Sequence, residues 1–352
     1  MKKIDIKELS QKKLGEWFEK QGVKPYRAGQ IFKWIYIHQA NSFEEMTDLS
    51  KSLRELLNEH YTINRLEKSN IETASDGTKK YLFRLEDGEY TECVLIPGAN
   101  RFTLCVSSQV GCAQNCRFCL TAKGGFKRNL TIGEIVSQVR DILNDLPVKE
   151  GAAPTEKPFQ SIVFMGMGEP LANLPNIAAA LEIITNSDFG LKFSSRKITI
   201  STSGLVNRFE ELAETTNVNL AISLNATDNE TRSMLMPINK TFPIEDLLAA
   251  CRKIPMTKRE KITFEYILMK GVNDSEQHAY ELAKLLETVK AKINLIPFNE
   301  FPGSEFKRPD DNTIHKFLKI LLDSDYTAII RKSKGQDISA ACGQLRANQI
   351  NK

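Results

Sequence analysis

The feature that most limits the possible folds of this chain is a repeated alternation of strand-like and helix-like segments, which begins near residue 101. Each repeat starts with a short run rich in β-branched residues, and an amphipathic segment with helical periodicity follows. Because repeated strand–helix units form a parallel sheet, the pattern predicts an α/β fold with a partial barrel of about six units, of the (β/α)6 type. The active site of such a barrel lies at the carboxyl ends of its strands. The expected strands lie in RFTLCVSS, QSIVFMGM, RKITIST, VNLAISLN, KITFEYIL, KINLIPF and TAIIRKS.

The part of the chain before this repeat is organised differently. Three stretches carry apolar residues at helical spacing, namely residues 6–20, 25–39 and 48–61. Alternating apolar and polar residues around an Asp-Gly pair at 87–88 then predict a β-hairpin. We therefore expect a small N-terminal helical domain with a β-hairpin connection at residues 1–97, and a catalytic partial barrel with a C-terminal cysteine loop at residues 98–352.

The composition narrows the class of protein. The first residues are charged and amphipathic, and no run of about 18 apolar residues follows, so we expect a cytoplasmic protein without membrane association. Seven cysteines in a cytoplasmic chain of 352 residues indicate metal binding or catalysis rather than a framework of structural disulfides. A net charge of +4 is compatible with RNA binding but does not establish it.

Three of the cysteines are grouped directly after the first expected barrel strand, in the stretch GCAQNCRFC. Cys112, Cys116 and Cys119 have C-x3-C-x2-C spacing, and three such thiolates can hold an iron–sulfur cluster that keeps one iron open for a substrate. The alternative is a structural zinc site with Cys105 as the fourth ligand. Because a strand between Cys105 and the loop would direct that thiol elsewhere, the iron–sulfur interpretation is favoured.

The cysteine motif, with Phe118 before its last cysteine, resembles that of the radical S-adenosylmethionine (SAM) superfamily. The resemblance implies a 4Fe–4S cluster whose open iron binds SAM and reduces it to a 5′-deoxyadenosyl radical. Further stretches make nearly the whole chain similar to the RlmN/Cfr family of adenosine C-methyltransferases. These stretches are RAGQIFKWIY, VSSQVGCAQNCRFC, GFKRNLT, FMGMGEPL, ITISTSG, INLIPFNEFPG and DISAACGQL.

The family resemblance implies SAM-binding residues at the ends of several expected strands. Gly168 and Glu169 in the stretch GMGEP would face the SAM amino group, although a G-x-G pattern alone indicates only a tight turn. The other matching positions are Ser201, Ser223, Leu224, Asn225 and Asn299. Many relatives carry His in place of Asn225, and an amide does not take up a proton at neutral pH, so we expect a binding role there.

The resemblance also assigns roles to residues outside the cluster motif. Cys342 would accept a methyl group from one SAM molecule, and the radical from a second SAM would then remove hydrogen from that S-methyl group. After the resulting methylene radical had added to adenine, Cys105 would attack the Cys342 sulfur, release methyladenosine and form a transient disulfide. Glu92 matches a proton acceptor of the family, although a Glu on a hairpin strand normally faces solvent.

The implied substrate is an unpaired adenosine in RNA. The resemblance implies that 2-methyladenosine forms in the peptidyl-transferase region of 23S rRNA and next to the anticodon of tRNA, with an electron donor such as a flavodoxin-type reductant. Two alternatives stay open: methylation at C8 of the same rRNA adenosine, and a zinc-stabilised RNA-binding protein without catalysis. The basic residues expected near the barrel mouth, where they can contact phosphates, are Lys123, Lys127, Arg128, Arg331, Lys332 and Lys334.

Overall fold

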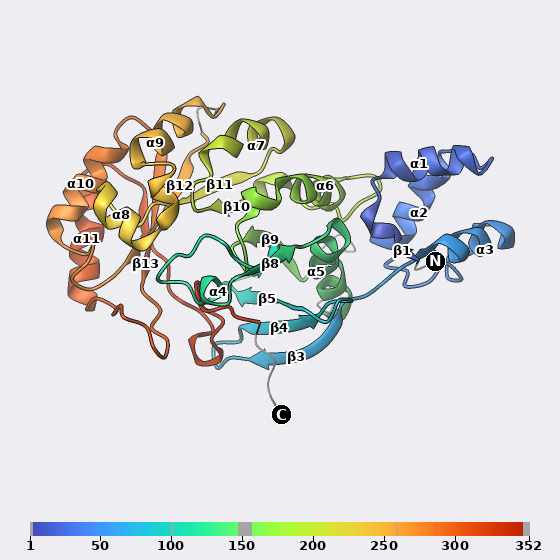
Figure 1. The fold of residues 1–352 in the computed structure, drawn as a ribbon, viewed down its shortest axis with the longest axis horizontal. Coiled ribbons are helices and arrows are strands. Elements are labelled where there is room, and N and C mark those ends of the chain that lie inside the picture. Colours follow the sequence, from blue (N-terminus) through green and yellow to red (C-terminus); the bar gives the residue numbers. More distant parts are fainter. Residues whose placement is uncertain (1–2, 100, 147–156, 258, 348–352) are drawn as a thin grey trace.

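The computed structural model describes residues 3–99, 101–146, 157–257 and 259–347. A small helical unit at the N-terminus lies beside a large curved sheet that is covered by helices (Figure 1). The helical unit consists of β1 (Ile4–Asp5), η1 (Ile6–Glu8), α1 (Gln11–Lys20), α2 (Arg27–Tyr36), α3 (Lys51–His60) and β2 (Tyr61–Thr62). The strands β1 and β2 pair in parallel and bring the two ends of the unit together.

The described strands include a ten-stranded sheet in the order β14-β13-β12-β11-β10-β9-β6-β5-β4-β3. Every strand predicted for the barrel is present, and β6 and β9 to β14 are parallel to one another. The mixed α/β fold with a partial barrel is therefore confirmed. The strands are β3 (Glu67–Thr73), β4 (Lys79–Arg84), β5 (Tyr90–Pro97), β6 (Phe102–Cys105), β9 (Phe159–Phe164), β10 (Ile198–Thr202), β11 (Asn219–Ser223), β12 (Ile262–Leu268), β13 (Ala291–Pro297) and β14 (Ala328–Ile330).

The predicted hairpin is part of this sheet. β5 pairs antiparallel with β6, with Val94 opposite Cys105, so β3 to β5 continue the barrel sheet at its edge. We had grouped these strands with the N-terminal domain. The division at residue 97 stays a prediction, and the pairing favours a division between β2 and β3 instead.

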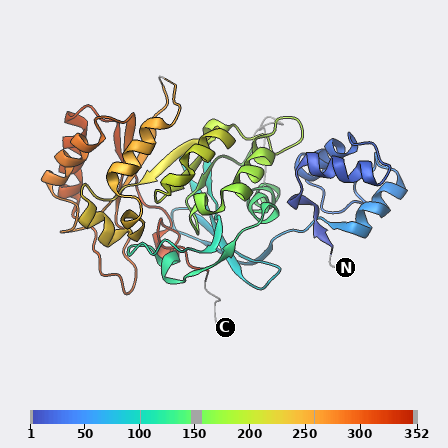
Figure 2. The same cartoon turned by 45° about the horizontal axis from the view of Figure 1, so that its top comes forward.

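Helices cover the outer face of the barrel, as Figure 2 shows. Their apolar side chains pack on alternate residues of the strands: along β12, Phe264 and Tyr266 are fully buried in the main core. The intervening Glu265 and Ile267 face the barrel interior. The helices are α5 (Ile132–Asp145), α6 (Leu174–Thr185), α7 (Phe209–Thr215), α8 (Asn229–Leu235), α9 (Ile244–Lys253), α10 (Glu276–Leu286) and α11 (Asp311–Asp323).

Short elements connect these helices and strands. A small hairpin of β7 (Gln109–Gly111) and β8 (Phe126–Asn129) encloses the cysteine loop and α4 (Leu120–Lys123). The short 3₁₀ helices are η2 (Pro170–Asn173), η3 (Ser195–Lys197), η4 (Val206–Arg208), η5 (Pro237–Lys240) and η6 (Gln336–Ile338). Among the described residues, no helix has the length and apolar character needed to cross a membrane.

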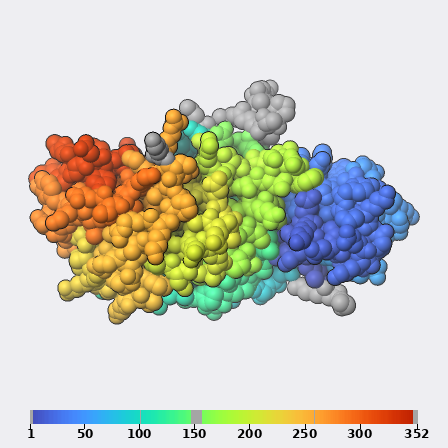
Figure 3. Space-filling view, turned by 90° about the horizontal axis from the view of Figure 1, so that it is seen from above, coloured from blue at the N-terminus to red at the C-terminus, as the bar shows by residue number. Residues whose placement is uncertain are grey.

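The N-terminal unit forms one end of an elongated molecule (Figure 3) and is held there by α5. Arg140 on α5 is fully buried and donates hydrogen bonds to the carbonyl oxygens of Ile35 and Ala40, at 3.0 and 2.5 Å. Glu8 accepts a hydrogen bond of 2.6 Å from Thr131, the N-cap residue of α5. These polar contacts fix the orientation of the unit relative to the barrel.

Candidate active site

A cavity with about 870 Å³ of empty space, counting its open mouth, lies at the carboxyl ends of the barrel strands. Its place is the one expected for the active site of a barrel. We call it the SAM cavity. Its polar lining consists of Cys112, Gln114, Cys116, Cys119, Thr121, Glu169, Ser201, Thr202, Ser203, Ser223, Glu265, Arg331 and Cys342.

The cysteine motif forms one wall of the SAM cavity. The loop is fixed by a hydrogen bond from the backbone N–H of Arg117 to the carbonyl of Leu235 on α8, at 3.0 Å, and Cys119 is the N-cap residue of α4. Burial raises the pKa of Cys112 to about 12 and also raises the pKa of Cys116 well above its usual value. These thiols would therefore stay protonated on their own, and a bound metal has to displace their protons.

The donor set of this wall fits a 4Fe–4S cluster. Cys112, Cys116 and Cys119 all face the cavity, whereas Cys105 lies in a separate apolar cluster and is not available as a fourth ligand. Within the described ranges, no three Cys, His, Asp or Glu side chains converge as the ligands of one metal ion would. Three spaced thiols suit a cubane, in which three irons each bind one thiolate and the fourth iron stays open. The zinc alternative therefore lacks the fourth ligand expected for it, because Cys105 does not belong to this wall.

Glu169 lies beside the cysteine wall and is held firmly. Its Oε2 accepts hydrogen bonds from the backbone N–H and the hydroxyl of Ser203, at 2.7 and 2.8 Å, and its Oε1 accepts one from the backbone N–H of Leu171 at 3.0 Å. Burial raises the pKa of this carboxyl. Gly168 before it has a φ of 98°, and a Cβ at this position would lie 2.8 Å from the backbone nitrogen of Gln109. Only glycine fits this turn.

The other predicted SAM-binding residues fall into two groups. Ser201 and Ser223 line the SAM cavity, as expected for hydroxyl ligands at strand ends. Leu224 is buried in the main core, and the Asn225 amide is bonded within the protein, with its Oδ1 accepting from the backbone N–H of Ile267 at 2.8 Å. Neither side chain lines the SAM cavity, so a contact from these two positions would have to come from the backbone.

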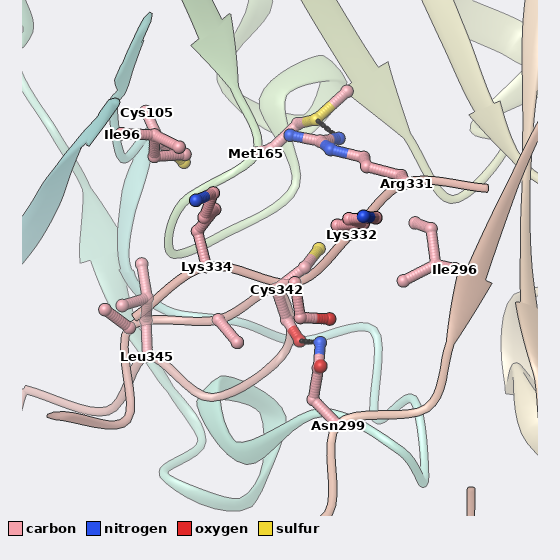
Figure 4. A pocket seen from close by; sticks show the side chains of 13 residues that line it. Ile96, Cys105, Met165, Ile296, Asn299, Arg331, Lys332, Lys334, Cys342 and Leu345 are labelled. Atoms are coloured by element: carbon pink, nitrogen blue, oxygen red, sulfur yellow. Dashed lines mark hydrogen bonds between the residues drawn. The ribbon is translucent and has the colours of Figure 1, made fainter. Parts of the chain in front are cut away.

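A second cavity adjoins the first and contains the two remaining predicted cysteines. Figure 4 shows Cys105 on one side and Cys342 nearer the centre, with Arg331 above Cys342. Cys342 and Arg331 line both cavities, so Cys342 can face the SAM cavity and Cys105 alike. All seven cysteines are free thiols, and the expected disulfide between Cys105 and Cys342 stays a prediction.

The two thiols differ in accessibility. Cys105 is 7% exposed, and burial, reinforced by the neighbouring Cys342 sulfur, raises its pKa to about 12. Cys342 is exposed at the cavity, although the surrounding protein atoms raise its pKa as well. The positive charge of Arg331 counteracts both shifts and favours the thiolate.

The Cys342 loop, residues 335–345, is anchored at its first arm by the turn between β3 and β4. Asp76 accepts a hydrogen bond from the backbone N–H of Gly335 at 3.0 Å, and Asp337 accepts one from the backbone N–H of Ser75 at 2.9 Å. Lys80 donates a hydrogen bond of 2.7 Å to the carbonyl of residue 338. The hairpin at the edge of the sheet therefore holds the loop in place.

The second arm of the Cys342 loop is fixed by the cysteine wall. Thr121 on α4 donates a hydrogen bond of 2.6 Å to the carbonyl of Leu345, and the backbone N–H of Leu120 donates one of 2.7 Å to the carbonyl of Gly343. Asn299 belongs to the second cavity and binds the Cys342 carbonyl, where we had expected a contact with SAM.

Glu92 does not lie on the solvent face, contrary to the default for its hairpin strand. It is 4% exposed, and its Oε2 accepts a hydrogen bond of 2.9 Å from the backbone N–H of Arg346, just after the Cys342 loop. Burial raises its pKa to about 6, against the opposing effect of Lys80, whose Nζ lies 3.8 Å from Oε1. The expectation failed because β4 and β6 flank β5 on both sides and the C-terminal segment covers it.

The basic residues predicted near the barrel mouth have different surroundings. Lys332 and Lys334 line the second cavity, and Lys123 lies over the ring of Phe301, 4.9 Å from its centroid. Arg128 is occupied by ion pairs with two carboxylates, so it is a poor candidate for a phosphate contact.

Sequence reasoning missed Glu265 altogether and treated Arg331 only as a contact to phosphate. Both lie inside the SAM cavity. The available signal was a charged residue in the middle of the apolar strand KITFEYIL, since a buried parallel strand rarely carries a carboxylate without a purpose.

Comparison with known proteins agrees with this geometry. The family model of the radical SAM superfamily matches about half of the chain, residues 106–283, so the class of protein is a radical SAM enzyme. A second model, described as the ribosomal RNA large subunit methyltransferase N-terminal domain, matches residues 4–63.

Several relatives share nearly the whole chain. The dual-specificity RNA methyltransferase RlmN of Desulfosudis oleivorans is 56% identical over 98% of this chain and 91% of its own. That of Geobacter sulfurreducens is 52% identical over 97% of this chain and 92% of its own. The crystal structure of a radical SAM methyltransferase from Sphaerobacter thermophilus has a TM-score of 0.89 and 41% identity, and covers 98% of this chain and 100% of that one. The chain belongs to the RlmN family.

Proposed function

We propose that this protein is a radical SAM RNA methyltransferase that forms 2-methyladenosine in 23S rRNA and in tRNA. The observation that carries the proposal is the position of Cys342, which lines both the cavity of the cluster cysteines and the cavity of Cys105. One thiol at the junction of two sites is what a carrier of a carbon unit requires. The names of the relatives, dual-specificity RNA methyltransferase RlmN, support the substrate class.

The chain would hold its two cofactors through residues of the SAM cavity. Cys112, Cys116 and Cys119 would bind the cluster, and Glu169 with hydroxyls such as Ser201 would bind SAM. When bound, cluster and SAM supply the electron, the methyl groups and the radical that are needed because adenine C2 is electrophilic and bears hydrogen. The remaining steps belong to side chains of the protein.

Cys342 would accept the first methyl group as a thiolate, with Arg331 favouring loss of the thiol proton. A new S–CH3 bond forms while SAM loses its methyl group and becomes S-adenosylhomocysteine. Exposure of Cys342 at the cavity then lets the methylated sulfur meet an adenine base. Because the base has to leave its stack to reach this position, the substrate would be an unpaired or flipped adenosine.

Cys105 would release the product. Once the adduct has lost one electron and its ring proton, the Cys105 thiolate attacks the Cys342 sulfur, the bond from that sulfur to the carbon unit breaks, and a disulfide forms between the two cysteines. The released carbon takes up a proton and becomes the methyl group of the product. Glu92 would take the proton that leaves the ring carbon, since a carboxyl with a pKa of about 6 is mostly ionised at neutral pH and still accepts a proton. The segment at Arg346 covers Glu92, so this role requires that segment to shift.

RNA would bind over the mouth of the second cavity. Lys332 and Lys334 line that cavity and would contact phosphates, and the N-terminal unit extends the surface at one end of the molecule. An enzyme that acts on rRNA and tRNA would work in the cytoplasm, where a flavodoxin-type reductant would supply the electron.

Anaerobic turnover tests the proposal. The reconstituted enzyme is incubated with SAM, reduced flavodoxin and either an rRNA fragment or tRNA, and the nucleosides are identified by mass spectrometry against standards. We expect 2-methyladenosine in both RNAs. Formation of 8-methyladenosine would replace the proposal with the C8 alternative, and unmodified RNA together with intact SAM would refute it.

A further inference from the structure

One buried carboxylate in the SAM cavity takes part in none of the steps above. Glu265 lies on β12, and its side chain faces the barrel interior. Its neighbours in the sequence, Phe264 and Tyr266, face the opposite side of the strand and pack in the main core. Glu265 is 4% exposed. A carboxylate in this position is expensive to desolvate, so an apolar residue would pack better unless the carboxylate has a partner.

The hydrogen bonds of Glu265 are incomplete. Its Oε1 accepts a hydrogen bond of 2.9 Å from the side-chain amide of Asn294 on β13. Its Oε2 is buried and has no hydrogen-bond partner among the described residues. Leaving a buried acceptor unpaired costs about 1–3 kcal/mol, and more for a charged group, which favours a donor supplied by a ligand.

The position of Glu265 indicates which part of SAM would supply that donor. Glu169 follows β9, and β10 and β11 separate β9 from β12, so three strand spacings of about 4.8 Å place Glu265 roughly 14 Å away across the sheet. The amino group of SAM belongs at Glu169 in the function proposed above. The nucleoside half then extends towards β11 and β12, where Ser223 lies directly opposite Glu265 in the strand register.

We propose that Oε2 of Glu265 accepts a hydrogen bond from a ribose hydroxyl of SAM, which makes Glu265 a cofactor-binding residue. This inference rests on the proposed placement of SAM in the cavity. The donors of SAM are its ammonium group, the two ribose hydroxyls and the adenine amino group, and of these the hydroxyls lie in the middle of the molecule. Asn294 occupies Oε1, so Oε2 is the carboxylate oxygen of this cavity-lining residue that is left for a ligand.

Binding measurements on the anaerobically reconstituted full-length enzyme test the proposal. Glu265→Gln keeps the shape and can keep an acceptor for Asn294, but it puts a donor where Oε2 accepted. We expect SAM and S-adenosylhomocysteine to bind the variant about 10- to 100-fold more weakly by calorimetry, since the lost bond involves a charged acceptor. Of the 2′-deoxy and 3′-deoxy analogues of S-adenosylhomocysteine, the one that lacks the donating hydroxyl should bind wild type and variant with equal affinity.

A second measurement does not need the ligand. Because Oε2 has no partner, and an amide at this position can still accept from Asn294, the melting temperature of the ligand-free Glu265→Gln variant should be equal to or above that of wild type. A clear decrease would mean that Glu265 serves the fold through Asn294, and the proposal would be overturned. The rise in melting temperature on adding SAM should shrink in the variant.

Control variants separate this inference from the proposed placement of SAM. Glu169→Gln, or Ser201→Ala if the former unfolds, should weaken SAM binding. If these controls lose affinity while Glu265→Gln binds SAM normally, the inference fails and the placement stands. If none of the variants changes affinity, the placement itself is wrong. A loss for SAM but not for S-adenosylhomocysteine would show that Glu265 attracts the sulfonium charge, which contradicts the hydroxyl contact.

Discussion

The side-chain amide of Asn299 donates a hydrogen bond of 3.1 Å to the backbone carbonyl of Cys342. Its side-chain oxygen accepts a second one of 3.1 Å from Gln336, so both polar groups of Asn299 hold the Cys342 loop. The same residue matches a SAM-binding position of the family. A contact to SAM would compete with these bonds, and SAM binding would thereby loosen the loop that carries the reactive thiol.

Asn299→Ala should increase the mobility of the Cys342 loop even without ligand. Each lost hydrogen bond contributes about 1 kcal/mol, which corresponds to roughly a fivefold change in the opening equilibrium. Hydrogen–deuterium exchange of the peptide that contains residues 335–345 measures this change. Adding SAM should accelerate exchange in wild type and have little further effect in the variant. Identical exchange in all four samples would contradict the coupling.

Cys105→Ala should trap RNA on the enzyme. Without the resolving thiolate, nothing attacks the Cys342 sulfur after the carbon unit has joined the base, so a covalent RNA–protein adduct accumulates. Denaturing gel electrophoresis with labelled RNA and peptide mass spectrometry locate the link at Cys342. The control is Cys251→Ala, which changes a buried thiol of α9 in the main core and should turn over normally. Free methyladenosine from Cys105→Ala would exclude its resolving role.

Glu92→Gln should change how stability depends on pH. The pKa of Glu92 is raised from 4.5 to about 6 by burial, so its protonated form is favoured in the folded state. Stability from this group is fully present below the unfolded pKa and is lost as pH rises through about 6. Relative to the variant, wild type should lose up to ~2 kcal/mol of unfolding free energy between about pH 4.5 and pH 7. Urea denaturation across this pH range measures the difference in unfolding free energy between wild type and variant. A difference that stays constant with pH would refute the raised pKa of Glu92.

Arg140→Met should detach the N-terminal unit from the barrel. The substitution leaves Asp141 without its buried partner and removes the Arg140 donors from three carbonyls of the N-terminal unit, which should lower the free energy of unfolding by about 3–5 kcal/mol. The matched control is Arg65→Met, because Arg65 contacts the same aspartate at 3.7 Å but is one-third exposed. This substitution should lower the free energy of unfolding by less than ~1 kcal/mol. Urea unfolding gives both values. Equal costs for the two variants would show that burial of Arg140 is not decisive.

The sequence allowed the barrel strands to be predicted because each is a short apolar run followed by a helix with a clear period. The sequence did not show that the hairpin belongs to the barrel sheet. Its strand β5 pairs with the edge of β6, and no local sequence pattern indicates which strand edge another strand will pair with. The burial of Glu92 was missed for the same reason. Strand alternation predicts which residues share a face, but not whether that face is covered by a distant segment such as the one at Arg346.

The candidate site shows a similar limit. Cys105 and Cys342 were assigned together through a family resemblance, and the structure places both in one cavity. Glu265 had no motif, and it stands out only once the structure shows a buried, unpartnered acceptor on a residue that lines the cavity. Leu224 and Asn225 matched a motif, yet their side chains pack within the protein, because a matching position fixes a residue type and not the direction of its side chain.

The anchoring of the Cys342 loop to the β3–β4 turn has a consequence for the synthesis of the protein. Ser75 and Asp337, which are hydrogen-bonded, are 262 residues apart in the chain. Domains generally fold as the chain emerges from the ribosome, so the cysteine wall and most of the sheet can form while residues around 342 are still being added. Cys342, the carrier thiol of the proposed function, would therefore join the site last. A chain that is released early by a stalled ribosome would have the thiols to bind a cluster but none at the junction of the two cavities, and would be unable to capture RNA covalently.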